Sequence, residues 1–384
     1  MIARRGDRIP PFIVMEVLER ALQMGREGHD VIHMEVGEPD FDTPRCVKEA
    51  AYQAMLEGMT HYTHSLGLHE LREAISGHYY EKYNVEVDPG RIIVTNGSSP
   101  AMLLLFGALL DPGEEVILSN PCYACYPNVV EFVDGVPAEV PVFEEDGFQY
   151  RPEEIEARLG PRTKAIIINS PSNPTGNLLE PGVMRDIAAL GRRGMYVVSD
   201  EIYHGLVYER REHSILEFTD HAFVINGFSK LYAMTGWRLG YLIAPEEFVR
   251  PIQKMQQNLF ISANAFVQKA GVTALTLCRE EVGAMVRTYD ERRRFMLPRL
   301  REIGFGVAVE PHGAFYILAN AKHFTDDSYA FALELLENTH VATTPGIDFG
   351  SGAEGYIRFS YANNLDNLAE GMRRLGEYLA ERRE

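Results

Sequence analysis

The sequence predicts an α/β fold in which a large domain holds a mostly parallel sheet between helices and a smaller α+β domain follows. Short, almost entirely apolar runs recur through the middle of the chain, as in strands that are buried on both faces of a sheet. Helix-patterned segments separate several of them; Pro181–Gly191, for example, begins at a proline and ends at a glycine. The expected strands are residues 91–95, 116–118, 165–168, 196–198, 222–225 and 239–244.

The domain division follows from a change of pattern along the chain. Alternating strands and helices imply a parallel sheet that is covered on both faces, whereas mixed elements follow a charged helix at residues 281–301. We therefore expect an N-terminal segment (1–44) that contributes to the small domain and to a substrate loop, a large domain (45–285) and a small domain (286–384). Further expected elements are helices at 15–27, 328–338 and 365–382 and extended segments at 306–309, 314–318 and 357–361.

Composition restricts the class of protein. The chain has 384 residues and a net charge of −18, which argues against nucleic acid as a partner because phosphate backbones are bound by clustered Lys and Arg. The most apolar stretch, residues 101–110, suits a buried helix and is too short to span a membrane. With no signal-peptide pattern near the N-terminus, we expect a cytoplasmic protein with no membrane contact.

The four cysteines are too few for a disulfide framework in a chain of this length. Cys122 and Cys125 form a C-x-x-C pair, which is compatible with a redox motif or with half a zinc site. No second pair is present to complete a tetrahedral site, so no metal is expected.

Polar residues collect where four of the expected strands end. In parallel α/β sheets, ligands bind beyond the carboxyl ends of the strands, so these residues are expected to meet at one edge of the sheet. The four clusters are Asn96-Gly97-Ser98-Ser99, Asn169-Ser170-Pro171-Ser172-Asn173-Pro174-Thr175-Gly176, Asp200-Glu201-Ile202-Tyr203 and Gly227-Phe228-Ser229-Lys230.

Several of these motifs, in their order, resemble a known family. The series resembles the signature of class I/II aminotransferases, which are fold type I enzymes dependent on pyridoxal 5′-phosphate (PLP) in the aspartate aminotransferase superfamily. Seven ordered matches over about 320 residues make chance agreement a poor explanation. The matching stretches are Gly37-Glu38-Pro39-Asp40-Phe41, Tyr62, Asn173-Pro174-Thr175-Gly176, Val198-Ser199-Asp200-Glu201-Ile202-Tyr203, Phe228-Ser229-Lys230, Gly236-Trp237-Arg238-Leu239-Gly240 and Arg358.

The resemblance implies that Lys230 forms the Schiff base with PLP and later moves the proton of the substrate. Asp200 is expected to pair with the pyridine nitrogen and to keep it protonated, so that the ring can absorb electrons. Tyr203 and Asn173 are expected to hydrogen-bond the cofactor's 3-oxygen. Taken alone, Asp200 would read as a helix cap and Asn173 as a turn residue.

The phosphate of the cofactor is assigned to a helix start and an arginine. Ser98 and Ser99 begin a helix, where free backbone N–H groups favour an anion, and Arg238 matches the family's phosphate-binding arginine. Many family members carry a serine three residues before the lysine. Here that position is Gly227, and Ser229 is expected to replace the missing hydroxyl only in part.

The remaining residues implied by the resemblance bind the ring, the substrate and a second subunit. Tyr123 matches the aromatic residue that stacks on the cofactor. Arg358 matches the arginine that binds the substrate α-carboxylate with its two-pronged guanidinium, with Gly37 and Asn173 beside it. Tyr62 matches a tyrosine that reaches the phosphate of the neighbouring subunit, which implies a homodimer.

Transamination by a ping-pong route, from an L-amino acid to a 2-oxo acid such as 2-oxoglutarate, is the expected activity. A PLP-dependent carbon–sulfur β-lyase on the same fold and a non-catalytic PLP-sensing regulator are the alternatives. Aspartate-using relatives often carry a lysine at the position of Ser99, so a neutral aliphatic, alanine-like or aromatic donor is expected. Residues 12–15, Phe315 and Tyr316 are expected to line its side-chain pocket.

Overall fold

The computed structural model describes residues 2–191 and 194–382. Its centre is a seven-stranded sheet in which β8 alone runs antiparallel to its neighbours, so the predicted α/β fold with a mostly parallel sheet is confirmed. In spatial order the strands are β2 (Ile92–Thr95), β8 (Gly240–Ile243), β7 (Ala222–Gly227), β6 (Tyr196–Asp200), β5 (Thr163–Asn169), β3 (Glu115–Asn120) and β4 (Val136–Pro141).

Helices bury both faces of this sheet. Successive residues of a strand point to opposite faces, and Ile92 and Val94 accordingly belong to one hydrophobic cluster whereas Ile93 belongs to another. This double burial explains why the strands are almost wholly apolar. One face is covered by α5 (Ser98–Leu109), α6 (Cys125–Phe132) and α9 (Glu246–Leu259), the other by α4 (His69–Tyr83), α7 (Pro152–Arg158), α8 (Pro181–Gly191) and α10 (Ala265–Leu277).

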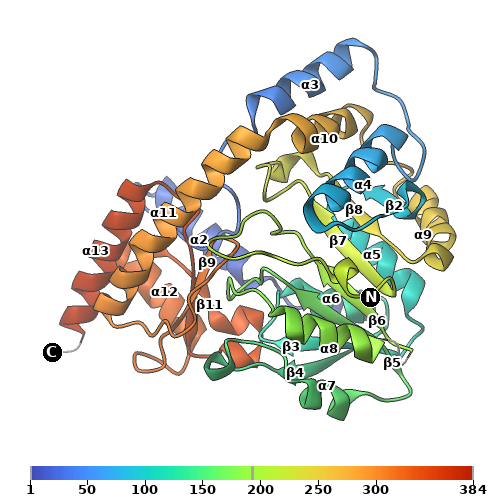
Figure 1. Cartoon of the computed structure of the whole chain (residues 1–384). Coiled ribbons are helices and arrows are strands. Elements are labelled where there is room, and N and C mark those ends of the chain that lie inside the picture. Colours follow the sequence, from blue (N-terminus) through green and yellow to red (C-terminus); the bar gives the residue numbers. More distant parts are fainter. Residues whose placement is uncertain (1, 192–193, 383–384) are drawn as a thin grey trace.

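The C-terminal elements form a second body beside the sheet, to the left in Figure 1. Helix α11 (Arg279–Ile303) leaves α10 and packs against α13 (Leu365–Glu381). A small antiparallel sheet has the order β11 (Thr344–Pro345), β12 (Tyr356–Ser360), β9 (Tyr316–Asn320), and α12 (Ser328–Thr339) packs beside it. The predicted domain boundary at residues 285 and 286 lies within α11, and the division stays a prediction.

The N-terminal segment joins this second body. Strand β1 (Ile32–His33) pairs in parallel with β10 (Val341–Ala342), and α2 (Ile13–Arg26) buries Val17 and Ala21 against Leu336. Two further helices are α1 (Arg4–Arg8) and α3 (Arg45–Leu56), and α3 packs on α10. The residues that follow β1 reach the segment beyond β7, where Gly37 accepts a hydrogen bond from Lys230 and Thr43 donates one to the carbonyl of Ala233.

Two elements differ from the expectation. The sequence did not predict β4, because this edge strand contains two prolines and is only partly buried, so it lacks the apolar run of a central strand. Residues 306–309 were expected to be extended but form no strand; Gly306 makes a single bridge to Asn320.

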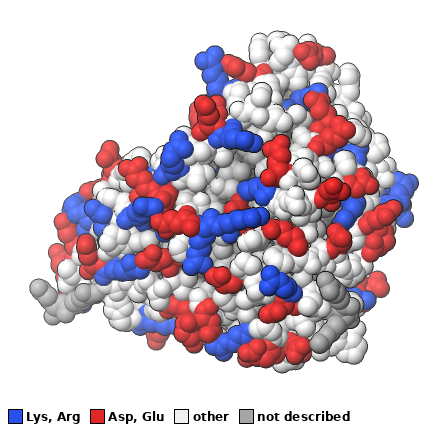
Figure 2. All heavy atoms as spheres, in the orientation of Figure 1, with Lys and Arg blue, Asp and Glu red and all other residues white. Residues whose placement is uncertain are grey.

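The surface is mixed in charge. Figure 2 shows acidic and basic side chains interspersed over the visible face, without a broad region of basic side chains. Within the described residues no helix is long and apolar enough to cross a membrane.

Candidate active site

A cavity of about 190 Å³ lies at the carboxyl ends of β5, β6 and β7, where the sequence predicted the site. Its wall is largely apolar on the side of the N-terminal segment, which contributes Phe12, Val14, Met15 and Val36. The cavity brings together nine of the predicted site residues, namely Gly37, Ser98, Ser99, Tyr123, Asn173, Asp200, Tyr203, Lys230 and Arg358.

Lys230 follows the last residue of β7 by three positions and points into the cavity. Its Nζ donates a hydrogen bond to the carbonyl oxygen of Gly37, which closes the N-terminal segment over it. Desolvation lowers the pKa of Lys230 to about 8, against the opposing effect of Glu38. A larger fraction of its amine is therefore neutral and nucleophilic near pH 7 than for a solvated lysine.

Asp200 ends β6 as a buried carboxylate with two hydrogen bonds. Tyr126 donates its hydroxyl to Oδ2 at 2.7 Å, and the Ile202 backbone N–H donates to Oδ1 at 3.1 Å. Burial nevertheless raises the pKa of Asp200 to about 6. A carboxylate this buried is stabilised by a cation, and a protonated ring nitrogen is such a partner.

The raised pKa predicts a pH-dependent stability of the cofactor-free chain. Below about pH 4 the Asp200 carboxyl is protonated in both folded and unfolded chains. As the pH rises to about 6, the carboxyl ionises more readily in the unfolded chain, so the free energy of unfolding falls by on the order of 3 kcal/mol. Thermal unfolding should therefore show the melting temperature of wild type falling relative to Asp200→Asn between pH 4 and pH 6. A constant difference between the two proteins would contradict this assignment.

Arg358 on β12 is buried, with 3% of its surface exposed. Its Nη1 donates to Oδ1 of Asn173 at 2.7 Å, and its Nη2 donates to the carbonyl oxygen of Glu35 at 2.5 Å and to Oγ1 of Thr344 at 3.1 Å. A guanidinium has five N–H donors, so two remain, and the buried Nε has no hydrogen-bond partner among the described residues. None of its three acceptors is charged, so the cation is held in place without being neutralised.

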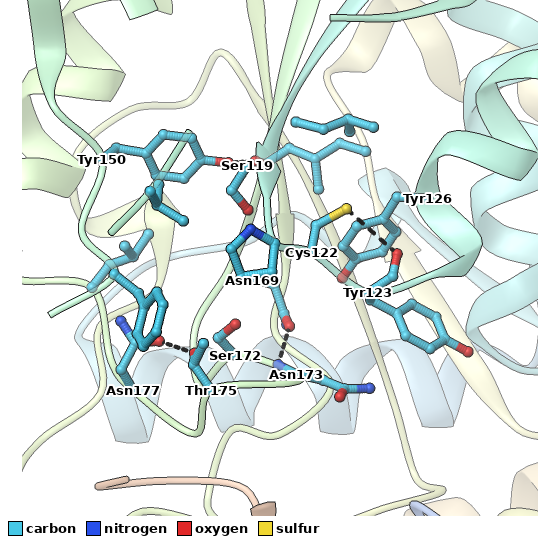
Figure 3. A pocket seen from close by; sticks show the side chains of 16 residues that line it. Ser119, Cys122, Tyr123, Tyr126, Tyr150, Asn169, Ser172, Asn173, Thr175 and Asn177 are labelled. Carbon is cyan, nitrogen blue, oxygen red and sulfur yellow. Dashed lines mark hydrogen bonds between the residues drawn. The ribbon is translucent and has the colours of Figure 1, made fainter. Parts of the chain in front are cut away.

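Asn169 hydrogen-bonds the backbone of two site residues. Its Oδ1 accepts the backbone N–H of Asn173 at 2.8 Å, and its Nδ2 donates to the backbone carbonyl of Asp200 at 2.9 Å. This side chain lines a small adjoining pocket of about 20 Å³. Figure 3 shows it at the centre of that pocket, with Tyr150 and Cys122 around it. A pocket of this size and polarity has room for about one water molecule.

The residues that are expected to bind the cofactor's phosphate lie at and beside the start of α5. Gly97 precedes the helix with φ +104°, a conformation that favours glycine, and a Cβ there would lie 2.6 Å from Nη2 of Arg238. The Arg238 guanidinium thus lies against the free N–H groups of the helix start, although Arg238 is exposed and does not line the cavity. Nη1 of Arg238 donates to the carbonyl of Thr235 at 2.9 Å, and the guanidinium has further N–H donors for an anion.

Close packing accounts for Gly227. A Cβ at this position would lie 3.0 Å from the Cα of Gly240 and 3.0 Å from the carbonyl oxygen of Leu239, so β7 and β8 leave little room for a side chain. A serine at this position would require these strands to shift apart.

Tyr62 is not part of this cavity. Its side chain is 80% exposed in the single chain, on the segment between α3 and α4. Contact with a neighbouring subunit therefore stays a prediction.

An aromatic side chain from the segment before α6 faces the cavity. Tyr123 lines the cavity and meets the ring of Tyr126 edge to face at 5.3 Å. Beside it, burial raises the pKa of Cys122 to about 12, which makes the thiol a poor nucleophile. No group of three or more potential metal ligands occurs in residues 2–191 and 194–382.

Two contacts in the site were not predicted from the sequence. Tyr126, which donates a hydrogen bond to Asp200, follows Tyr123 by three residues, and its backbone N–H donates to the Tyr123 carbonyl at the start of α6. Tyr316 was expected in the side-chain pocket; it lines the cavity, but its hydroxyl lies 2.8 Å from that of Tyr203. Phe315 is not among the cavity-lining residues and packs edge to face on Tyr203.

Comparison with known proteins agrees with this geometry. The family model described as aminotransferase class I and II matches residues 29–375. The chain belongs to the class I and II aminotransferases. Their cofactor is PLP, and the residues described above fit it: an enclosed lysine, a buried carboxylate, an aromatic wall, and a helix start beside an arginine.

Individual relatives cover almost the whole aminotransferase. The (5-formylfuran-3-yl)methyl phosphate transaminase of Methanocaldococcus jannaschii is 43% identical over 99% of this chain and 100% of its own. The aspartate/prephenate aminotransferase of Thermus thermophilus is 38% identical, covering 98% of each chain. Among solved structures, a Methanococcus jannaschii protein described as similar in its active site to kynurenine aminotransferases superposes with a TM-score of 0.92 at 41% identity, covering 99% and 100% of the two chains.

Proposed function

We propose that this aminotransferase moves the amino group of a neutral L-amino acid, aliphatic, alanine-like or aromatic, to a 2-oxo acid such as 2-oxoglutarate. One observation carries the choice of donor. Lys230 and Arg358 are the only cationic side chains among the described residues that line the cavity. If Lys230 holds the cofactor, Arg358 alone remains for a carboxylate, and the apolar N-terminal wall faces the rest of the substrate.

Each residue has a distinct task in this proposal. PLP, when bound, supplies an electron sink that stabilises negative charge at the substrate Cα. Lys230 holds the cofactor covalently and then, once freed, carries the proton to and from Cα. Asp200 keeps the ring nitrogen protonated, and Arg358 orients the substrate by its α-carboxylate. The N-terminal segment, through Gly37, excludes water from the amine.

The position of Ser99 supports a neutral donor. In aspartate-using relatives a lysine often stands there, whereas here a small neutral side chain lines the cavity at the start of α5. A distal carboxylate of aspartate would lose its solvation without gaining a cation from this chain, at a cost of several kcal/mol.

A donor screen tests the proposal. With 2-oxoglutarate as acceptor, kcat/KM for alanine, leucine, phenylalanine and kynurenine should exceed that for aspartate by about tenfold or more. Ser99→Lys should raise kcat/KM for aspartate and lower it for neutral donors, with Ser172→Lys as the matched control. Pyruvate and (5-formylfuran-3-yl)methyl phosphate belong in the acceptor panel. A preference of wild type for aspartate would overturn the proposed donor class.

The same assay separates transamination from β-elimination. In transamination, an amino acid alone converts the bound cofactor to its amino form, and this form accumulates until an oxo acid is added. Release of pyruvate and ammonia from a cysteine conjugate, without such accumulation, would identify a β-lyase instead.

We also propose that the aminotransferase is a homodimer in which Tyr62 contributes to the neighbouring active site. The 80% exposure of a large aromatic side chain in the single chain supports this. Tyr62→Phe should weaken PLP binding without changing the mass of the particle measured by light scattering.

A further inference from the structure

Tyr203 and Tyr316 form a buried hydroxyl pair at the wall of the cavity. Their oxygens are 2.8 Å apart, and the side chains are 4% and 1% exposed. Each hydroxyl carries one hydrogen and can accept others, so either could donate in this pair.

The pair has one direction that suits the proposed reaction. If Tyr203 donates its single hydrogen to the cofactor's 3-oxygen, that hydrogen is no longer available to Tyr316. Tyr316 must then be the donor within the pair. A hydroxyl that accepts a hydrogen bond becomes a stronger donor itself, because consecutive hydrogen bonds polarise one another.

We propose that Tyr316 is a positioning residue whose hydroxyl donates to Tyr203 and so strengthens the bond from Tyr203 to the cofactor's 3-oxygen. The inference rests on the proposed placement of that oxygen beside Tyr203. It adds a second tyrosine to the hydrogen bonds that set the pKa of the lysine-bound cofactor. It assigns the hydroxyl of Tyr316 a role distinct from lining the side-chain pocket.

The surroundings hold Tyr316 in this position. The Arg358 guanidinium lies 4.3 Å from the centre of its ring, and Arg358 and Tyr316 stand on the paired strands β12 and β9. On the other side the hydroxyl abuts Gly37, where a Cβ would collide with it. Tyr316 thus connects the residue that binds the α-carboxylate with the residue that contacts the cofactor.

The test is a spectroscopic pH titration of the PLP-loaded protein. Tyr316→Phe removes only the hydroxyl, so the lysine-bound cofactor should remain visible while its apparent pKa rises by about 0.5 units, as expected for the loss of one supporting hydrogen bond. Tyr208→Phe is the matched control, because Tyr208 is also buried and donates to the carbonyl of Ala314 at 2.5 Å but is not among the described residues that line the cavity. Its titration should match wild type.

The outcomes distinguish this inference from the proposed function. An unshifted titration in Tyr316→Phe, with the cofactor band present, would overturn the role of Tyr316 and leave the proposed function intact. A wild-type protein that binds PLP but transfers no amino group would instead contradict the proposed function. An equal shift in Tyr208→Phe would show a general structural effect and would also overturn the role.

A second observation is independent of the cavity. Cys46 near the start of α3 and Cys278 at the junction of α10 and α11 have their sulfur atoms 2.7 Å apart, which is about 0.7 Å longer than a disulfide bond. Cys278 also lines a surface groove of about 1030 Å³ between α4, α10 and α11, so small molecules reach its neighbourhood.

The geometry points to a disulfide between Cys46 and Cys278 as a covalent modification site. An oxidised low-molecular-weight disulfide would supply the oxidant: a Cys46 thiolate attacks one of its sulfurs, and the first half leaves as a thiol. Cys278 then attacks the mixed disulfide and releases the second half as a thiol, so that two protein thiols are oxidised and one reagent disulfide is reduced. Burial raises the pKa of Cys278, which makes this second step slow near neutral pH.

Peptide mapping under non-reducing conditions tests the cross-link in the full-length holoenzyme. After treatment with oxidised glutathione, a Cys46–Cys278 peptide should appear, and the melting temperature should rise by about 5 °C relative to protein kept in reductant. Cys46→Ser and Cys278→Ser should abolish both effects, and Cys125→Ser should retain both. Glutathione adducts without the linked peptide would overturn the assignment. A cross-link that joins Cys46 or Cys278 to Cys122 or Cys125 instead would also overturn it.

Discussion

Replacing Lys230 by alanine is expected to abolish the visible absorbance band of the lysine-bound cofactor and to lower kcat by more than about 10³-fold. In the proposed function two roles are lost together, because the same amine would hold the cofactor covalently and move the proton at Cα. The lowered pKa of Lys230, about 8, makes that amine available near neutral pH. Absorbance spectra and steady-state kinetics of the PLP-loaded protein measure both effects.

Lys254→Ala is the control for this variant. Lys254 is an exposed lysine on α9, so its removal should leave the band and kcat unchanged. A band retained in Lys230→Ala at the wild-type wavelength would show that another group holds the cofactor.

Arg358→Ala is expected to lower kcat/KM by about 10²–10⁴-fold for every amino acid tested, mainly through KM, while PLP stays bound. The estimate follows from losing two charge-assisted hydrogen bonds to a carboxylate, at about 1.5–3 kcal/mol each. Because the α-carboxylate is common to all substrates, the loss should be similar for alanine and phenylalanine. Kinetics with several donors, together with the absorbance band, checks both statements.

The matched control for Arg358 is Arg293→Ala. Arg293 is also buried and charged, but its partners are Asp290 and Glu209, away from the cavity. That variant should lose stability and keep its KM. Arg358→Lys should recover part of the activity, since lysine keeps the charge but lacks the fork. A loss confined to one donor would place Arg358 in the side-chain pocket instead.

The sequence by itself determined the class of fold and the polar residues at the strand ends, and its resemblance to the class I/II aminotransferases implied the chemistry expected of them. Apolar runs with polar ends predicted a parallel sheet, because strands that are covered on both faces exclude polar side chains except where they stop. Asp200 lies at the end of one such strand and Lys230 lies three residues beyond another, and the resemblance to the class I/II aminotransferases implied their roles. Edge strand β4 lacked the apolar signal and was missed.

Only the tertiary structure decided which distant residues meet. The bond from Lys230 to Gly37, the bonds from Arg358 to Asn173 and Glu35, the Tyr203–Tyr316 pair and the contact of Cys46 with Cys278 each join segments more than 100 residues apart. Apolar periodicity fixes the local path of the chain, but such contacts depend on how whole helices and strands pack against one another. The strength of a hydrogen bond depends on differences of a few tenths of an ångström in the distance between donor and acceptor. Such distances are set only when the helices and strands have packed around the hydrophobic core.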